Sequence, residues 1–516
     1  MSNAPNILIF MTDQQRGCTV LPGHPYQAAT PHLDRFRKEA ATFSRAYCPS
    51  PHCCPSRATF FTGLMPTQHG VWHNVQVPNA ISRGPLPGTP FWSESLAAEG
   101  YGLAFSGKWH VSNADGPARW GWREGLVTAA PNCPELDVED RRGHARAALA
   151  KKLKRLNPEP YGPRQPGQVI REGFPDYRHY GTQDNPFRDG DVVEDGCKQL
   201  RELAAGEDPW CLFIGTLGPH DPYTPPKAFL DRYPEDDPRI RLPDTFWDSL
   251  QDKPELYRRT RDRFDQLTEA EHREAIRHYL AFCSYQDALF GQVLDALNAT
   301  GQADDTLVVF LSDHGDYLGD HGLWAKGLPA FQSAYHVPAI IRMPAGVDRE
   351  ASAGKTLDPL VSLTDFGPTF LDATGCDRTP EGSPGRSLLP WIRGDQPSDW
   401  RQALHFQSQG NETLGIQRTV LTDRWQLTYN GYSYDELYDL ERDPDQMTNL
   451  LWPESRDERS LGRYPEQPLD PGLEAEVRDL YRQLWAFGLD HDDTLTNDYI
   501  MTALARYGPG TTLTRK

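Results

Sequence analysis

Two short and almost entirely apolar runs constrain the fold of this chain most strongly. Residues 6–11 read Asn-Ile-Leu-Ile-Phe-Met, residues 306–311 read Thr-Leu-Val-Val-Phe-Leu, and polar residues follow each run at once. Strands that are buried on both faces of a parallel sheet have this composition. Helical patterns alternate with further apolar strands between and after the two runs. This order predicts an α/β protein with a large mixed, mainly parallel sheet flanked by helices.

The remaining elements follow from the same patterns. The helices that the spacing predicts within the first 385 residues are 31–43, 92–99, 191–205, 270–297 and 363–373. The further strands that it predicts there are 102–106, 210–215 and 337–342. Two irregular, Pro-rich and Arg-rich regions, about 132–188 and 225–265, are expected to be surface insertions that shape a ligand pocket.

The pattern changes after about residue 385. Arg418–Tyr429 alternates polar and apolar residues like one antiparallel strand, and Leu473–Phe487 has helical spacing. We therefore expect two domains, residues 1–385 and a small C-terminal α+β subdomain over 386–516 that ends in a helix and a tail. The tail after Asp490 is a candidate arm for a homo-oligomer.

Composition limits the partners and the compartment. The chain has 516 residues, with 53 Lys and Arg against 72 Asp and Glu, so its net charge is −19. Such a chain is expected to repel nucleic acid and anionic membranes. No apolar run approaches the length of a membrane span, and the N-terminus lacks the basic region of a signal peptide. Nine cysteines without a Cys-x-x-Cys pair indicate reduced thiols, so we expect a cytoplasmic protein.

The segment around Cys53 carries the most specific chemistry. It reads Cys53-Cys54-Pro55-Ser56-Arg57, and Pro55 suits the first position of a helix. Cys53 would then lie at a helix N-terminus, where free N–H groups favour a thiolate or an anion. Arg57, one turn later, adds a fixed positive charge. Taken alone, the same pattern also fits a buried structural thiol beside a helix.

Polar residues gather where predicted strands end. Asp13 and Gln14 follow the first strand, and Asp313 and His314 follow the strand over 306–311. Open α/β sheets bind their ligands at the carboxyl ends of strands, so these residues are expected to meet. Each pair alone could be a helix cap or a hydrogen-bonded pair. Together they offer mostly oxygen donors and one imidazole, which suits Ca²⁺ or Mn²⁺ better than Zn²⁺.

Cys53-x-Pro55-Ser56-Arg57 resembles the signature of the type I sulfatases of the alkaline phosphatase superfamily, in which this cysteine becomes formylglycine. The resemblance implies a formylglycine-generating enzyme as a partner in maturation. It also implies that an oxygen of the aldehyde hydrate attacks sulfur, and that a covalent sulfo-enzyme then collapses to release inorganic sulfate. One divalent cation would be held by Asp13, Gln14, residue 53, Asp313 and His314. Gln14 and His314 replace the Asp and Asn of many members, as in branches similar to arylsulfatases, choline and iduronate-type sulfatases and phosphonate monoester hydrolases.

The resemblance assigns further roles residue by residue. Lys108 and His110 match the family's Gly-Lys-Trp-His motif, where the lysine binds sulfate oxygens and the histidine lies close to the nucleophile. His220 and Lys326 match the residues that stabilise or protonate the leaving oxygen. Arg57 is expected to share in neutralising the transferred group. Asn74 resembles a position that contacts the anion in phosphonate hydrolases.

The alcohol part of the substrate is the least determined feature. Aromatic side chains beside the catalytic positions could stack on a ring or pack in the core. These are Trp72, His73, Trp109, Tyr223 and Trp324. We expect a catalytic domain over 1–385 that hydrolyses a small anionic sulfate ester to an alcohol or phenol. The alternatives are a phosphonate monoester or phosphodiester hydrolase with the same site, and a non-catalytic binding protein with an unmodified Cys53.

Overall fold

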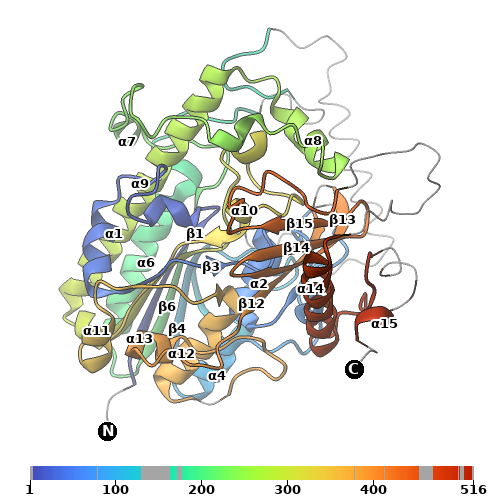
Figure 1. Cartoon of the computed structure of the whole chain (residues 1–516). Helices are drawn as coiled ribbons and strands as arrows, with labels where there is room; N and C mark the ends of the chain where they lie inside the picture. The colour runs from blue at the N-terminus through green and yellow to red at the C-terminus, as the bar shows by residue number, and fades with distance from the viewer. Residues whose placement is uncertain are drawn as a thin grey trace, which may run out of the picture.

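A computed structural model shows an α/β fold around one large sheet (Figure 1). It describes residues 4–77, 80–129, 163–170, 177–376, 378–411, 413–452, 469–497 and 505–513, with residues 499 and 502. The order of the eight strands across the large sheet is β10-β2-β9-β7-β1-β6-β4-β5. Their bounds in that order are Thr356–Leu357, Ala41–Phe43, Ala339–Arg342, Thr306–Ser312, Asn6–Asp13, Trp210–Pro219, Gly102–Lys108 and Arg123–Thr128.

The sheet is mainly parallel, as the sequence predicts. β1 lies between β6 and β7 and is parallel to both, and β4 is parallel to β5 and β6. Only β9, among the described strands of this sheet, is antiparallel to its neighbours. The carboxyl ends of β7, β1, β6 and β4 therefore lie side by side along one edge.

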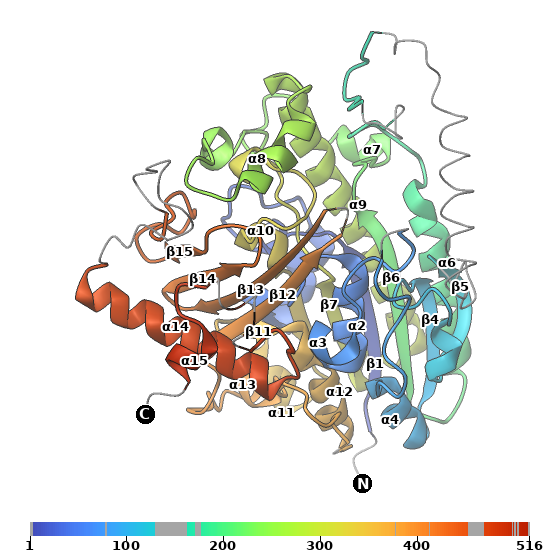
Figure 2. The same cartoon turned by 90° about the vertical axis from the view of Figure 1, so that its right-hand side faces the viewer.

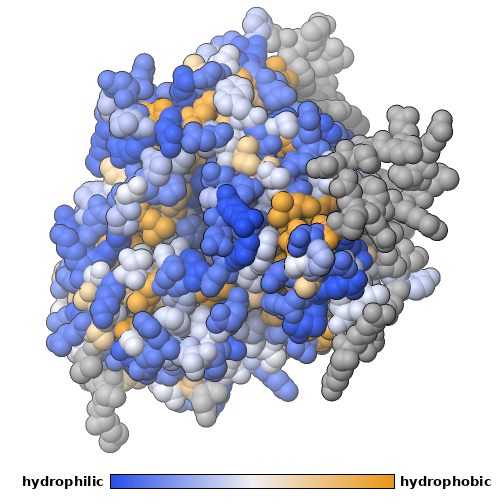
Figure 3. Space-filling view, viewed as in Figure 1, coloured by the Kyte–Doolittle hydropathy of each residue, from blue (hydrophilic) through white to orange (hydrophobic). Residues whose placement is uncertain are grey.

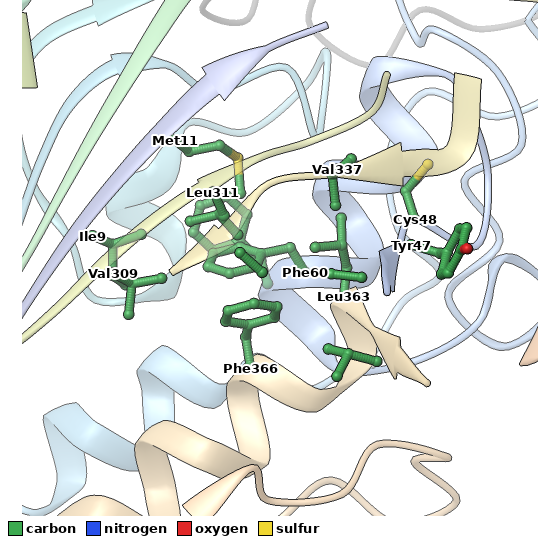
Figure 4. Packing of buried hydrophobic residues seen from close by; sticks show 14 of the residues in the cluster. Ile9, Met11, Tyr47, Cys48, Phe60, Val309, Leu311, Val337, Leu363 and Phe366 are labelled. Atoms are coloured by element: carbon green, nitrogen blue, oxygen red, sulfur yellow. The ribbon is translucent and has the colours of Figure 1, made fainter. Parts of the chain in front are cut away.

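Both faces of the sheet are covered, which explains why its central strands are apolar throughout. Ile9 and Met11 of β1 face a cluster that includes Phe60 and Phe366, as Figure 4 shows. The alternate residue Phe10 faces the other cluster and packs against Phe290 of α9, with ring centroids 5.3 Å apart. A strand buried on both sides cannot alternate polar and apolar residues.

Helices form the outer layers. The first face carries α2 (Cys53–Thr62), α4 (Trp92–Ala98) and α12 (Phe366–Thr374), and the other carries α1 (Pro31–Phe36), α6 (Asp189–Ala204) and α9 (Glu269–Thr300). The shorter helices are α3 (Pro66–His69), α7 (Lys227–Leu230), α8 (Glu255–Arg261), α10 (Gln332–Tyr335), α11 (Val347–Ser352), α13 (Leu389–Arg393) and α15 (Pro509–Thr512). A small sheet of β11 (Val361–Ser362), β3 (Ala46–Tyr47) and β8 (His336–Val337) lies nearby.

The C-terminal part forms its own antiparallel sheet beside the large one (Figure 2). Its strands are β12 (Ala403–Gly410), β13 (Leu414–Thr422), β14 (Trp425–Asn430) and β15 (Glu436–Asp439). Helix α14 (Pro471–Asp490) packs Leu480 and Trp485 against the apolar side chains of this sheet. The α+β composition predicted after residue 385 is thus present, while the two-domain boundary remains a prediction.

Three element predictions are wrong in detail. Arg418–Tyr429 is two strands, because the alternation continues through a tight turn at Asp423–Arg424. The run 337–342 is split between two sheets at Pro338, which cannot donate a ladder hydrogen bond. The helix predicted over 31–43 ends as a helical turn at Glu39, and Ala41–Phe43 joins the sheet as β2.

The predicted insertions are only partly described. Most of 132–188 lies outside the described residues, whereas 225–265 contains α7, α8 and two short 3₁₀ helices. In Figure 1 these elements lie at the end of the molecule opposite to the N-terminus. The face in Figure 3 is mainly hydrophilic with separate apolar patches. Across the described helices, none combines the length and apolar character needed to cross a membrane.

Candidate active site

The site forms where four neighbouring strands end. Asp13 is the last residue of β1, and Lys108 is the last residue of β4. His220 follows the end of β6, and Asp313 follows the end of β7. These strands are adjacent in the order β7-β1-β6-β4, so residues about 300 positions apart in sequence meet at one edge.

Helix α2 brings the fifth element to this edge. It begins at Cys53, ends before Gly63 in the left-handed conformation (φ 71°), and is buried along its whole length. The sequence analysis expects Pro55 at the first position of the helix, but Pro55 is the third residue of α2. The first turn of a helix has no partners for its N–H groups, so a proline is tolerated at this position as well. Cys53 lies at the N-terminus, as predicted.

Four side chains converge on one point. The ligand atoms of Asp13, Cys53, Asp313 and His314 all lie within 4.8 Å of one another, and all four residues are buried. His314 Nε2 is 3.2 Å from Cys53 Sγ, 3.6 Å from Asp13 Oδ1 and 3.7 Å from Asp313 Oδ1. His314 Nδ1 is 2.9 Å from the Gly315 carbonyl oxygen, which can only accept, so Nδ1 carries the hydrogen. Nε2 is then free of hydrogen and can act as a ligand.

This donor set fits a hard divalent cation. Two carboxylates and one imidazole are suitable ligands for Ca²⁺ or Mn²⁺, whereas a thiolate at position 53 is the softer exception. Burial and the neighbouring Asp13 raise the pKa of Asp313, because two carboxylates in one dry site repel each other. A bound dication would remove that repulsion. An oxygen at position 53, as in formylglycine, would replace the soft sulfur donor and give a set of oxygen and nitrogen donors that suits a hard cation.

Two buried cations, Arg57 and Lys108, contact the carboxylates of the cluster. Arg57 is completely buried and donates from Nε to Asp313 Oδ2 (2.8 Å) and from Nη2 to Asp13 Oδ2 (3.2 Å). The Lys108 ammonium group also contacts Asp13 Oδ2. Although burial alone would raise it, the pKa of Asp13 is lowered, mainly by Lys108 with contributions from His220 and Arg57. Asp13 is thus an anion with one oxygen on the cations and the other directed to the metal-ligand cluster.

Lys108 also acts on residue 53, together with Lys326. Burial opposes ionisation of the Cys53 thiol, but the positive charges of Lys108 and Lys326 outweigh it and lower its pKa well below the usual value. Burial together with Lys108 lowers the pKa of His110 to about 4. His110 has a left-handed backbone (φ 55°), which is uncommon for a residue with a side chain. The imidazole beside residue 53 is therefore neutral and able to accept a proton.

Gln14 also has a left-handed backbone (φ 64°) and joins the metal cluster to a second layer of residues. Its Nε2 donates to Asp316 Oδ2 (2.6 Å) and Asp221 Oδ1 (3.2 Å). Its Oε1 accepts from Lys326 Nζ at 2.5 Å. Because a carboxylate cannot donate, an Asp or Glu at position 14 would repel these two acids, whereas the amide bonds to them. This explains locally why the chain has Gln where many members of the resembled family have Asp.

His220 and Lys326 form a pair at the mouth of the site. Lys326 Nζ lies 2.5 Å from His220 Nε2, and His220 Nδ1 lies 2.6 Å from the Asp221 carbonyl oxygen. Since that carbonyl oxygen can only accept, Nδ1 donates to it and Nε2 accepts from Lys326. Burial and Lys326 would lower the pKa of His220, but its interactions with Asp221, Cys53 and Asp13 outweigh them and raise it. The pair can hold a proton next to a departing oxygen.

A cavity of about 190 Å³ opens over this pair. His220, Lys326 and Trp324 line it, and so does Asn74, whose Oδ1 accepts from the Cys54 N–H at 3.1 Å. Three of the residues predicted to touch the substrate do not line the cavity and are fully buried, namely His73, Trp109 and Tyr223.

Two of these buried residues, Trp109 and Tyr223, make packing and hydrogen-bond contacts of their own. Trp109 packs among aromatic rings such as Phe61, at a centroid distance of 5.2 Å, and its Nε1 donates to the Asp115 carbonyl oxygen. Tyr223 donates to Asp316 Oδ2 at 2.7 Å and belongs to an apolar cluster. These contacts favour the core interpretation for Trp109 and Tyr223, and substrate binding by His73, Trp109 and Tyr223 stays a prediction.

Several residues of the site were missed by the sequence analysis. Asp221 directly follows His220, and Asp316 lies two residues after His314, so the signal that could have found them is their position beside predicted site residues. Arg263, Asn411 and Thr413 also line the cavity. No local pattern marks them, because only the folding of the 225–265 region and of the C-terminal sheet brings them to the strand ends.

The comparisons with known proteins agree with this geometry. The model of the sulfatase family matches residues 5–376, and the model of the C-terminal part of N-sulphoglucosamine sulphohydrolase matches residues 319–460. The first match covers most of the chain. The chain therefore belongs to the sulfatase family of the alkaline phosphatase superfamily, and it is a sulfuric ester hydrolase.

The individual relatives resemble this chain at low sequence identity. The choline-sulfatase of Rhizobium meliloti is 28% identical over 494 residues, which cover 93% of this chain and 87% of the relative. The arylsulfatase of Clostridium perfringens is 27% identical over 470 residues, covering 88% and 92%. The solved structure of a phosphonate monoester hydrolase from Silicibacter pomeroyi has a TM-score of 0.69 at 22% identity, with 95% and 97% covered. At this identity the structure supports the fold alone.

Proposed function

We propose that this protein hydrolyses sulfate monoesters to inorganic sulfate and an alcohol or phenol, with Cys53 in its formylglycine form. The observation that carries the proposal is the convergence of Asp13, Cys53, Asp313 and His314 within 4.8 Å, with buried cations beside them. The hydrate of the formylglycine aldehyde would supply the nucleophilic oxygen. Membership of the sulfatase family and the arylsulfatase and choline-sulfatase relatives support the same reaction.

The metal requirement follows from the donor set. One divalent cation, Ca²⁺ or Mn²⁺, would be held by residue 53 together with Asp13, Gln14, Asp313 and His314. When bound, it supplies a Lewis acid that neutralises charge on the transferred group.

The residues of the chain would divide the remaining work. Arg57 and Lys108 place fixed positive charge beside the cluster, where the three oxygens of the transferred sulfuryl group gain negative charge. Lys326 and His220 hold a proton at the mouth of the cavity, where the departing alcohol oxygen must receive one. His110 is neutral and interacts with residue 53, so it would remove a proton from an oxygen on that residue.

A phosphonate monoester or phosphodiester hydrolase is the second candidate. Its support is the fold shared with the phosphonate monoester hydrolase from Silicibacter pomeroyi and the presence of Asn74 in the cavity. The Lys108-Trp109-His110 sequence matches the sulfatase motif and favours sulfate. A binding protein that keeps an ordinary Cys53 is the third candidate, and the cationic residues around the cluster argue against it.

One preparation separates the three candidates. Protein made together with a formylglycine-generating enzyme is analysed by peptide mass spectrometry at residue 53, where the modification exchanges sulfur for oxygen and removes two hydrogens. The values of kcat/KM for an aryl sulfate and an aryl phosphonate monoester are then measured, with Cys53→Ala as the inactive control. We expect modified residue 53 and a preference for the sulfate. A clear preference for the phosphonate supports the second candidate, and an unmodified, inactive protein supports the third.

A further inference from the structure

The active-site cavity has a wall that the catalytic motifs do not provide. Leu256 and Thr260 of α8 and Arg263 of the following 3₁₀ helix line it on one side. Asn411 and Thr413, from the turn between β12 and β13, line it as well. These residues come from the 225–265 region and the C-terminal sheet. They meet the cavity beyond His220 and Lys326, where the alcohol part of a sulfate ester would lie.

Helix α8 and the 3₁₀ helix that follows it both present side chains to this space. Leu256 and Thr260 are four residues apart and lie on one side of α8, and Arg263 follows in the 3₁₀ helix. Arg263 is thus the positive charge that these two helices bring to the cavity. Arg259, on α8, is exposed and does not line the cavity.

The carboxylate of Asp221, which lines the cavity, already has hydrogen-bond partners. Among the described lining residues the single carboxylate is that of Asp221. Its Oδ2 accepts from the Tyr177 hydroxyl at 2.8 Å, and its Oδ1 accepts from Gln14 Nε2 at 3.2 Å and lies 3.4 Å from His220 Nδ1. Asp221 therefore belongs to the hydrogen-bond network of the catalytic pair. A cationic alcohol part would meet Arg263 and would have to compete for that one carboxylate.

We propose that the cavity selects sulfate esters whose alcohol part carries a second anionic group, a carboxylate or a further sulfate, and that Arg263 binds this group. This inference rests on the proposed sulfatase function and names the substrate class of the same site. An arginine offers a planar pair of N–H donors that matches a carboxylate or a sulfate. The polar side chains of Thr260, Asn411 and Thr413 can bond to hydroxyl groups of the same alcohol part.

The test uses three phenyl sulfates that differ in one ring substituent, namely a carboxylate, a carboxamide or a trimethylammonium group. For each ester, kcat/KM is measured with the wild-type protein, Arg263→Gln, Arg263→Lys and the control Arg259→Gln. Dividing the variant value by the wild-type value for the same ester removes differences in leaving-group reactivity. A hydrogen bond between charged groups predicts that Arg263→Gln lowers kcat/KM for the carboxylate ester about 10- to 100-fold more than for the carboxamide ester.

The other outcomes are equally decisive. Arg263→Lys should keep part of the selectivity and Arg259→Gln all of it, although both Gln variants remove the same net charge. Equal losses for the three esters in Arg263→Gln, or a wild-type preference for the ammonium ester, would overturn the proposal. Calorimetric binding of the esters to Cys53→Ser, with and without Arg263→Gln, measures the same selectivity without turnover. If the wild-type protein hydrolyses none of the three esters but binding still favours the carboxylate ester, the sulfatase function is rejected and the assignment of Arg263 is kept.

Discussion

Replacing Arg57 tests how the two carboxylates of the site are held together. Its guanidinium donates to Asp313, to Asp13 and, at 2.8 Å, to the Lys108 carbonyl oxygen. In Arg57→Met the side chain keeps an apolar stem, but the buried Asp313 loses its fixed counter-charge and Asp13 keeps only that of Lys108. Removing one partner of a buried ion pair costs about 3–5 kcal/mol. We therefore expect the free energy of unfolding of chelator-treated protein to fall by about that amount in a urea titration followed by tryptophan fluorescence.

Activity separates this role from general stability. Loss of a buried positive charge next to the transferred group is expected to lower kcat/KM for an aryl sulfate by about 100- to 1,000-fold. Arg401→Met is the matched control, because Arg401 also makes three hydrogen bonds, two to the buried Asp365 at 2.6 Å and one to the Pro384 carbonyl oxygen. The control should lose comparable stability and keep its kcat/KM. An Arg57→Met protein with wild-type kcat/KM, or with a stability loss below about 1 kcal/mol, would refute the reasoning.

Three further predictions address the metal, the core and pH. Treatment with a chelator should abolish aryl sulfate hydrolysis and lower the melting temperature, and Ca²⁺ or Mn²⁺ should restore both, since a ligand of the folded state stabilises it. Phe60→Ala, behind the active-site helix and fully buried, should lower the free energy of unfolding by about 3–5 kcal/mol, which a urea titration measures. Burial raises the pKa of Asp287, which accepts the N–H groups of His32 and Leu33, to about 7. Its folded pKa exceeds the unfolded value of about 4, so this group makes the protein less stable as pH rises from about 4 to 7. Asp287→Asn should remove that slope in unfolding titrations at several pH values, and an unchanged slope would contradict the assignment.

Sequence patterns predict the helices and strands that are buried in the same way along their whole length. The strands β1 and β7 and the long helix α9 are found within a few residues of their predicted bounds, because burial on both faces or on one helical stripe leaves a continuous pattern. The pattern is ambiguous where a turn preserves it, as at Asp423–Arg424. It is equally ambiguous where one proline divides a run between two sheets, as at Pro338.

For the site, the residues that the strand ends and α2 supply were predictable. Asp13, Asp313 and His314 meet Cys53 as the parallel topology requires. The cavity wall was not predictable, because Arg263 and Asn411 reach it from regions with no periodic pattern. Aromatic residues such as Trp109 could not be divided between core and cavity by type, since both environments favour large rings.

The position of a metal ion tests the central claim most directly. Crystals grown with Mn²⁺ and measured for anomalous scattering should show one strong peak among Asp13, Gln14, residue 53, Asp313 and His314, within ordinary coordination distance of their donor atoms. A fully loaded and active protein whose peak lies elsewhere, or that shows no peak between these side chains, would contradict the account.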